Sequence, residues 1–143
     1  MSYATIQNAK DLYGDDYVLQ SVDRDSNGDP DTTALTNAFA QASSEMDTYL
    51  GARVVVPLTA PVPDIIVQLC IDIAIYKLSS HPGGGLTDEK RKRYEDAIKW
   101  LTNYAKGVVT LPLPDTDEDP QPLPETSYPN DRLFTREKLG GLL

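Results

Sequence analysis

The chain has 143 residues, about the size of one domain, which excludes a multidomain enzyme. With 40% apolar and 24% charged residues, it can form a hydrophobic core from part of its length only, so some segment must lie outside that core. The net charge of −9 disfavours a protein that grips nucleic acid through a phosphate-neutralising surface.

The acidic charge is concentrated at the two ends of the chain. Residues 1–31 carry seven acids and two bases (−5), residues 32–110 eight of each (0), and residues 111–143 seven and three (−4). A single cysteine, Cys70, forbids an internal disulfide, as expected of a chain made in a reducing cytoplasm. The start of the chain is polar and the apolar run 65–78 is interrupted by polar residues, so we expect no signal peptide, no membrane span and a soluble, intracellular product.

The first part of the chain is predicted to form two helices separated by a polar loop. Thr5 caps a short helix that Gly14 ends, and the turn-forming residues 23–31 follow. A longer helix begins at Asp31 or Thr32 and ends near Gly51. Its predicted buried face consists of apolar residues spaced three, four and seven positions apart: Leu35, Ala38, Phe39, Ala42, Met46, Tyr49 and Leu50.

Two further helices are predicted after residues 53–58, a segment with three successive β-branched valines that forms an extended connector or a short strand. The third helix starts at Pro63 or Asp64 and runs to about Ser80; its apolar residues cover nearly the whole circumference, which is typical of a central core helix. Residues 81–85 stop it. Thr87 caps the fourth helix, which ends before Gly107 and buries Tyr94, Ala97, Ile98, Leu101, Tyr104 and Ala105.

The predicted fold is therefore mainly α: a small four-helix body with short extended or β segments, and a long extended C-terminal arm. We place the helical domain at residues 1–111 and the arm at residues 112–143, because six prolines interleaved with acids stand between Pro112 and Pro129. A floppy tail and a segment that orders on a partner both fit this composition, and we favour the second. The arm ends in apolar anchor residues, Leu133, Phe134, Leu139, Leu142 and Leu143.

The loop at residues 23–31 is the one candidate metal site in the sequence. Asp23, Asp25, Asn27 and Gly28 match the first positions of a calcium loop, and Asp31 lies near the ninth. The twelfth position, which must supply a bidentate carboxylate, falls on Ala34. Residues 17–22 also do not suggest the helix that should run into such a loop. A polar turn that leads into the next helix is the better interpretation, and a calcium-responsive binding module is the alternative.

No residue pattern points to catalysis, so we expect neither an enzyme nor a cofactor. One histidine, His81, and one cysteine can build neither a zinc tetrad nor a conventional triad. The carboxylate pairs Asp15–Asp16 and Glu95–Asp96 fit solvated helix faces better than general acid or base catalysis.

Four basic residues in succession, Lys90, Arg91, Lys92 and Arg93, form the one basic run of the sequence. On a helix they point around most of a turn, and nearby acids dilute them, so they do not form a face that reads a nucleic-acid groove. A solvated face is the plain interpretation. The functional alternatives are a contact with an acidic neighbouring copy, or a regulator whose DNA binding would depend on salt.

An ordered series of short segments resembles the head-tail connector proteins of Mu-like phages and prophages. The resemblance covers roughly residues 2–111, and none of its segments is unique alone. The segments are residues 3–5, the Asp-rich loop, residues 38–42 and 46–50, residues 53–58, residues 70–74, and residues 93–97, 100–101 and 105–107; residues 134–137 in the arm add to them. The proline-rich spacer is less typical of the family.

The resemblance implies a structural role. Such connectors, or adaptors, form a homo-oligomeric ring of about twelve copies between the portal protein and a tail-side or tail-terminator protein, with packaged DNA passing through the channel without specific binding. It implies a place at the head-tail interface of the virion, after synthesis in the bacterial host cytoplasm, and no membrane partner. No catalytic residues transfer, and an acidic channel wall would keep DNA from adhering.

Overall fold

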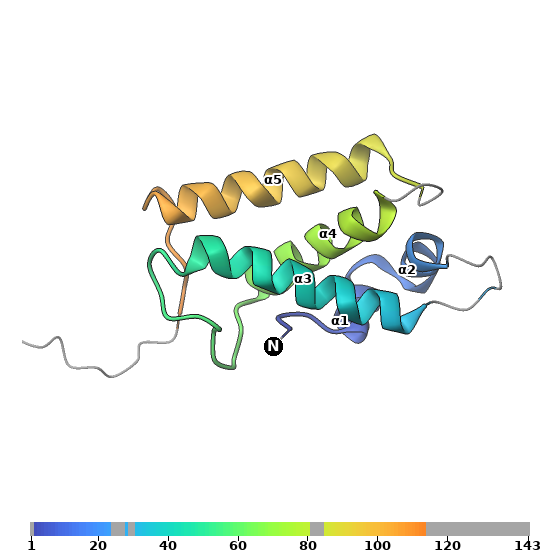
Figure 1. The fold of residues 1–143 in the computed structure, drawn as a ribbon, viewed down its shortest axis with the longest axis horizontal. Helices are drawn as coiled ribbons and strands as arrows, with labels where there is room; N and C mark the ends of the chain where they lie inside the picture. The colour runs from blue at the N-terminus through green and yellow to red at the C-terminus, as the bar shows by residue number, and fades with distance from the viewer. Residues whose placement is uncertain (1, 24–27, 29–30, 81–84, 114–143) are drawn as a thin grey trace, which may run out of the picture. The chain divides into compact units, whose positions relative to one another are not determined.

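The computed structural model describes residues 2–23, 28, 31–80 and 85–113, and this part of the chain holds five α-helices and no strand. The helices are α1 (Ile6–Tyr13), α2 (Asp15–Val22), α3 (Thr32–Leu50), α4 (Asp64–Ser79) and α5 (Asp88–Ala105), shown in Figure 1. The mainly α fold is confirmed. Residues 53–58 and 108–111 form connecting segments rather than strands.

The prediction of four helices misses α2. Gly14, at φ 88°, ends α1 and is also the N-cap of α2, so two short helices follow each other with one residue between them. Asp15 and Asp16 lie in the first turn of α2, where the positive end of the helix dipole favours acids. Val18 and Val22, four residues apart, turn the same face into the core. The interpretation of residues 17–22 as non-helical is therefore wrong.

The core is built around α4, against which all four other helices pack. Ten of its sixteen residues are buried, and they lie on every side of the helix. This confirms the prediction of a central core helix, whose apolar circumference needs neighbours all round. The largest side chains that pack here without exposure come from three helices: Leu35, Phe39, Met46, Leu50, Ile66, Ile71, Ile73 and Leu101.

Side-chain caps fix where the helices begin. The Asp31 carboxylate accepts a hydrogen bond from the Ala34 N–H at 3.0 Å at the start of α3, and the Thr87 hydroxyl accepts one from the Lys90 N–H at 3.2 Å at the start of α5. Thr5 and Asn8 form a reciprocal capping box on α1. Each cap satisfies backbone N–H groups that have no partner within the helix. The predicted starts of these three helices are confirmed.

The contacts of the chain group it into two units, Met1–Leu113 and Pro114–Leu143. The first contains all five helices and the core, and Leu111 and Leu113 pack against that core. The second lies outside the described residues, as does the predicted helix stop at residues 81–84. The arm and its apolar anchors therefore stay predictions from the sequence.

Candidate interaction surfaces

The loop between α2 and α3 is preceded by a helix after all, because α2 runs to Val22. The Gly28 N–H donates to the Asp23 carboxylate at 3.0 Å, and the Asp31 carboxylate caps α3. Both contacts are those of a polar turn that leads into a helix. The other two predicted calcium ligands, Asp25 and Asn27, lie outside the described residues.

The helix before this loop removes one argument against a calcium site but leaves the other in place. The twelfth position is still Ala34, and its N–H bonds to Asp31. Among the residues that the structure describes, no three His, Cys, Asp or Glu side chains are grouped as metal ligands. The calcium-responsive binding module stays an alternative. Calorimetric titration with calcium tests it, and absence of binding at millimolar calcium would exclude it.

The structure divides the basic run on α5 into two pairs. Arg91 and Lys92 are exposed, whereas Lys90 is buried and Arg93 half-buried. Lys90 donates to the Gly85 carbonyl at 3.3 Å, and its ammonium lies 5.6 Å from the ring centre of Tyr17. The two inward cations therefore cover α1 and α2, and only the outward pair is placed to meet another molecule.

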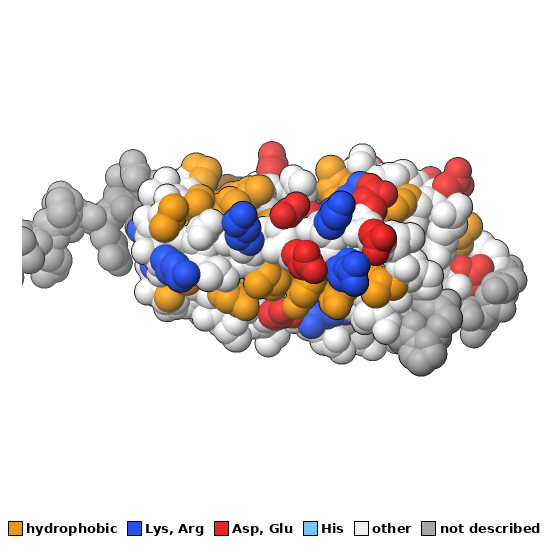
Figure 2. Space-filling model, turned by 90° about the horizontal axis from the view of Figure 1, so that it is seen from above, with side chains coloured by type: hydrophobic (Ala, Val, Ile, Leu, Met, Phe, Trp, Pro, Cys, Tyr) orange, Lys and Arg blue, Asp and Glu red, His pale blue; other side chains and the backbone are white. Residues whose placement is uncertain are grey.

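The exposed face of α5 carries charges of both signs side by side, as Figure 2 shows. Arg91 pairs with Asp88 at 3.0 Å, and Arg93 pairs with Glu89 one turn away. Such i, i+3 and i, i+4 pairs support the helix and reduce the net field of the face. This mixture is a poor match for a phosphate backbone, which needs an uninterrupted basic surface.

A buried carboxylate joins the N-terminal helices to the core. Asp72 of α4 accepts a hydrogen bond from the Tyr13 hydroxyl of α1, and the Arg93 guanidinium of α5 lies 4.5 Å from the Tyr13 ring centre. Arg93 also donates to the Tyr17 hydroxyl of α2 at 3.3 Å. Burial raises the pKa of Asp72, while the Tyr13 hydrogen bond and the charge of Arg93 act to lower it. One polar cluster thus holds four helices together.

This cluster is not among the predictions from the sequence. Asp72 is one of the polar residues that interrupt the apolar run 65–78, and an acid in a helix that is apolar all round must find a buried partner. That rule was available from the sequence. The identity of the partners was not, because Tyr13 lies 59 residues away in the chain.

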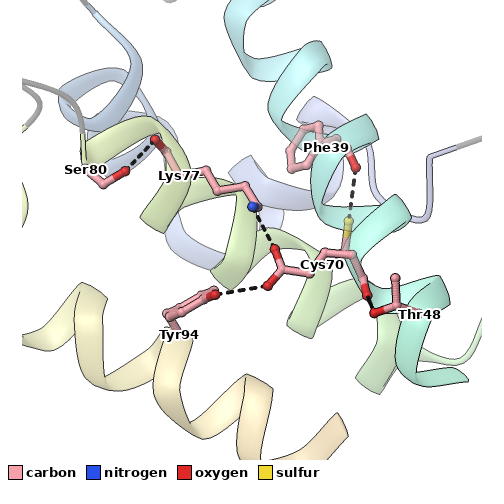
Figure 3. Close-up of polar contacts among 7 residues, drawn as sticks. Phe39, Thr48, Cys70, Lys77, Ser80 and Tyr94 are labelled. Carbon is pink, nitrogen blue, oxygen red and sulfur yellow. Dashed lines mark hydrogen bonds and ion pairs between the residues drawn. The ribbon is translucent and has the colours of Figure 1, made fainter.

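A second polar contact joins α3, α4 and α5 around Glu45. Its carboxylate pairs with the Lys77 ammonium at 2.7 Å and accepts a hydrogen bond from the Tyr94 hydroxyl at 3.0 Å (Figure 3). Burial and the Glu45 hydrogen bond raise the pKa of Tyr94 to about 12, so its hydroxyl stays a donor. The Tyr94 ring stacks on Tyr76 with centroids 4.0 Å apart. These contacts fix the three long helices rather than form a reactive site.

Cys70 offers no reactive thiol in this environment. It is fully buried beside the Ser43 hydroxyl, 3.5 Å away, and burial raises the pKa of the thiol. The thiolate is the nucleophilic form, so a raised pKa works against catalysis by this residue. His81 lies outside the described residues.

Comparison with known proteins places this helical body and its neighbouring segments in a phage family. The Bacteriophage Mu Gp36 family matches residues 3–128, and the chain belongs to this family. Within the described residues, no helix is long and apolar enough to cross a membrane.

Two relatives, one from a prophage and one from a phage, are similar to this chain. The chain is 39% identical over 88 residues to the Mu-like prophage FluMu protein gp36 of Haemophilus influenzae, a match that covers 62% of this chain and 60% of the relative. It is 31% identical over 109 residues to Gene product J of Escherichia phage Mu, covering 75% of this chain and 74% of that protein. The chain therefore matches less than two thirds of the prophage relative's length.

Proposed function

We propose that the protein is a non-enzymatic structural component of a phage particle, a head-tail connector that forms a ring between portal and tail. Membership of the Bacteriophage Mu Gp36 family carries this proposal, since it places the chain among proteins of Mu and a Mu-like prophage. The resemblance to head-tail connectors supplies the finer role, with the portal and a tail-side protein as partners and the head-tail interface of the virion as the location.

The architecture supports a scaffold rather than a catalyst. The buried Asp72 cluster and the half-buried Glu45 cluster each connect three or more helices, which favours a rigid body. A rigid body with different surfaces on its two sides can repeat head to tail, and such heterologous contacts close into a ring when the rotation fits.

The charge supports a channel that DNA slides through. Twelve copies at −9 each would carry about −108, a charge that repels phosphate instead of binding it. The net acidity that disfavours a nucleic-acid grip is thus compatible with a wall along which DNA passes. The same charge disfavours the alternative of a DNA-binding regulator. That alternative predicts an affinity for DNA that falls steeply as the salt concentration rises.

The test is particle shape. Negative-stain images of the full chain mixed with the portal protein of the same phage should show a ring with a central hole attached to the portal. A chain that stays monomeric alone does not decide the matter, because connectors of this kind are often monomers before assembly. A chain that binds neither portal nor tail-side protein would contradict the proposal.

A further inference from the structure

A shallow apolar groove lies between α1 and the first half of α4. It encloses about 320 Å³ and is lined by Asn8, Asp11 and Leu12 of α1 and by Asp64, Val67, Gln68 and Ile71 of α4. Leu12 is 46% exposed, one of the few large apolar side chains that the described part of the chain leaves open to solvent. An apolar floor of this kind gains free energy when another apolar surface covers it.

The edge of this groove is acidic. Asp11 and Asp64 are exposed carboxylates on its opposite walls, one from each helix. Asp11 accepts a hydrogen bond from the Gln7 amide, and within the described residues neither carboxylate forms an ion pair. The groove therefore suits an occupant with apolar side chains and basic groups beside them.

The end of the arm has this composition. Residues 131–143 hold three bases, Arg132, Arg136 and Lys138, against two acids, and they contain all five apolar anchor residues. This segment is the basic end of an otherwise acidic arm. The 17 residues 114–130 between it and the body would span up to about 50 Å if extended, well beyond the radius of gyration of about 13 Å of a domain this size.

We propose that residues 131–143 of one copy bind the α1–α4 groove of the neighbouring copy. The inference rests on the proposed ring. Groove and arm are two different surfaces of one chain, so their pairing is a heterologous contact that repeats around a ring. An arm bound to its own body would cover the same groove without joining two copies, so the arm adds a contact to the ring only when it is exchanged between copies.

Cross-linking tests the contact directly. Rings assembled on portal from an equal mixture of light and 15N-labelled copies would be treated with a carbodiimide, which joins an amine to a carboxylate without a spacer. We expect Lys138 to be linked to Asp11 or Asp64 in peptide pairs of mixed isotope. Links within one isotope only would mean that the arm folds onto its own body. Rings without any Lys138 link to the groove would overturn the inference as well.

A matched pair of variants tests the groove. Leu12→Glu places a charge on its floor and should reduce assembly at least tenfold, whereas Val55→Glu changes an apolar residue that is 89% exposed and not part of the groove. Both should keep the wild-type melting curve. Equal assembly of the two variants would contradict the docking site.

Charge exchange provides a rescue that a merely structural defect would not show. Asp11→Lys should weaken assembly, and adding Lys138→Asp in the same chain should restore it, because the pair is then reversed in sign. Absence of rescue argues against the contact. If wild-type chains form rings on the portal while these predictions fail, the arm–groove contact is wrong and the proposed function stands. If wild-type chains form no ring on the portal, the proposed function itself is wrong.

Discussion

Asp72 lies in α4, the most buried helix of the described residues, and the polar cluster around it includes side chains from α1, α2 and α5. The carboxylate is desolvated, it accepts a hydrogen bond from Tyr13, and the positive charge of Arg93 acts on it. Burial dominates, so the pKa of Asp72 is raised above its ordinary value. Desolvation of this kind is costly for the ionised form, and the cluster offsets only part of it.

The raised pKa of Asp72 predicts a pH dependence. Between the ordinary aspartate pKa and the raised one, the folded state holds more protons than the unfolded state, so stability falls as pH rises through this window. Asp72→Asn keeps an acceptor for Tyr13 but removes this titration. Urea unfolding at pH 4 and pH 7 should show the variant gaining stability relative to wild type at the higher pH. A constant or reversed difference would contradict the assignment.

Arg91 and Arg93 are two residues apart, yet we expect their replacement to change the free energy of unfolding by different amounts. Arg93 covers the rings of Tyr13 and Tyr17, whereas Arg91 forms only an exposed pair with Asp88. Arg93→Ala should lower the free energy of unfolding by about 1–2 kcal/mol, through lost cation–π contact and packing. Arg91→Ala should cost less than about 0.5 kcal/mol. If chemical denaturation shows the same loss in free energy of unfolding for both variants, the contacts of Arg93 with the tyrosine rings do not stabilise the fold.

At the scale of elements, α4 organises the body because every other helix packs on it. Ile75 points into this packing at 3% exposure, whereas Gln68 on the same helix is exposed. Ile75→Asp should cost about 4 kcal/mol or more, since an unpaired charge would be buried, and should abolish the cooperative melt. Gln68→Asp is the control and should melt as the wild type does. A normal melting curve for Ile75→Asp would contradict the central position of α4 in the core.

The long helices could be predicted from the sequence because their signals are local. Asp31 and Thr87 are capping residues that indicate where α3 and α5 begin. The apolar residues on every side of α4 indicate that this helix is buried. The eight-residue α2 was missed because it is short and shares Gly14 with α1. The inward turn of Lys90 and Arg93 could not be predicted either, since it depends on where the fold places Tyr13 and Tyr17.

The whole molecule consists of a helical body that contains the described core and an arm that we propose acts on neighbouring copies. The core and all polar clusters described above lie within residues 2–113. The composition of the arm, with its prolines and acids, cannot bury much apolar area on its own. Stability should therefore depend on the body alone, whereas assembly should need the arm as well.

Truncation after residue 113 tests this division. The shortened chain should keep its helical circular-dichroism signal and its cooperative melt, because no described core residue is removed. Its assembly on portal should be strongly weakened, because it lacks the segment that reaches the neighbouring copy. Loss of the cooperative melt would show that the arm belongs to the core, and undiminished assembly would show that the arm is not needed for it.

The assembly that we propose for this chain is a ring. The most direct measurement is negative-stain imaging of the full chain with the portal protein of its own phage, with copy number counted from class averages. We expect closed rings of about twelve copies with a central hole, seated on the portal. Portal particles without added density, beside chains that bind neither portal nor tail-side protein, would contradict the proposed ring.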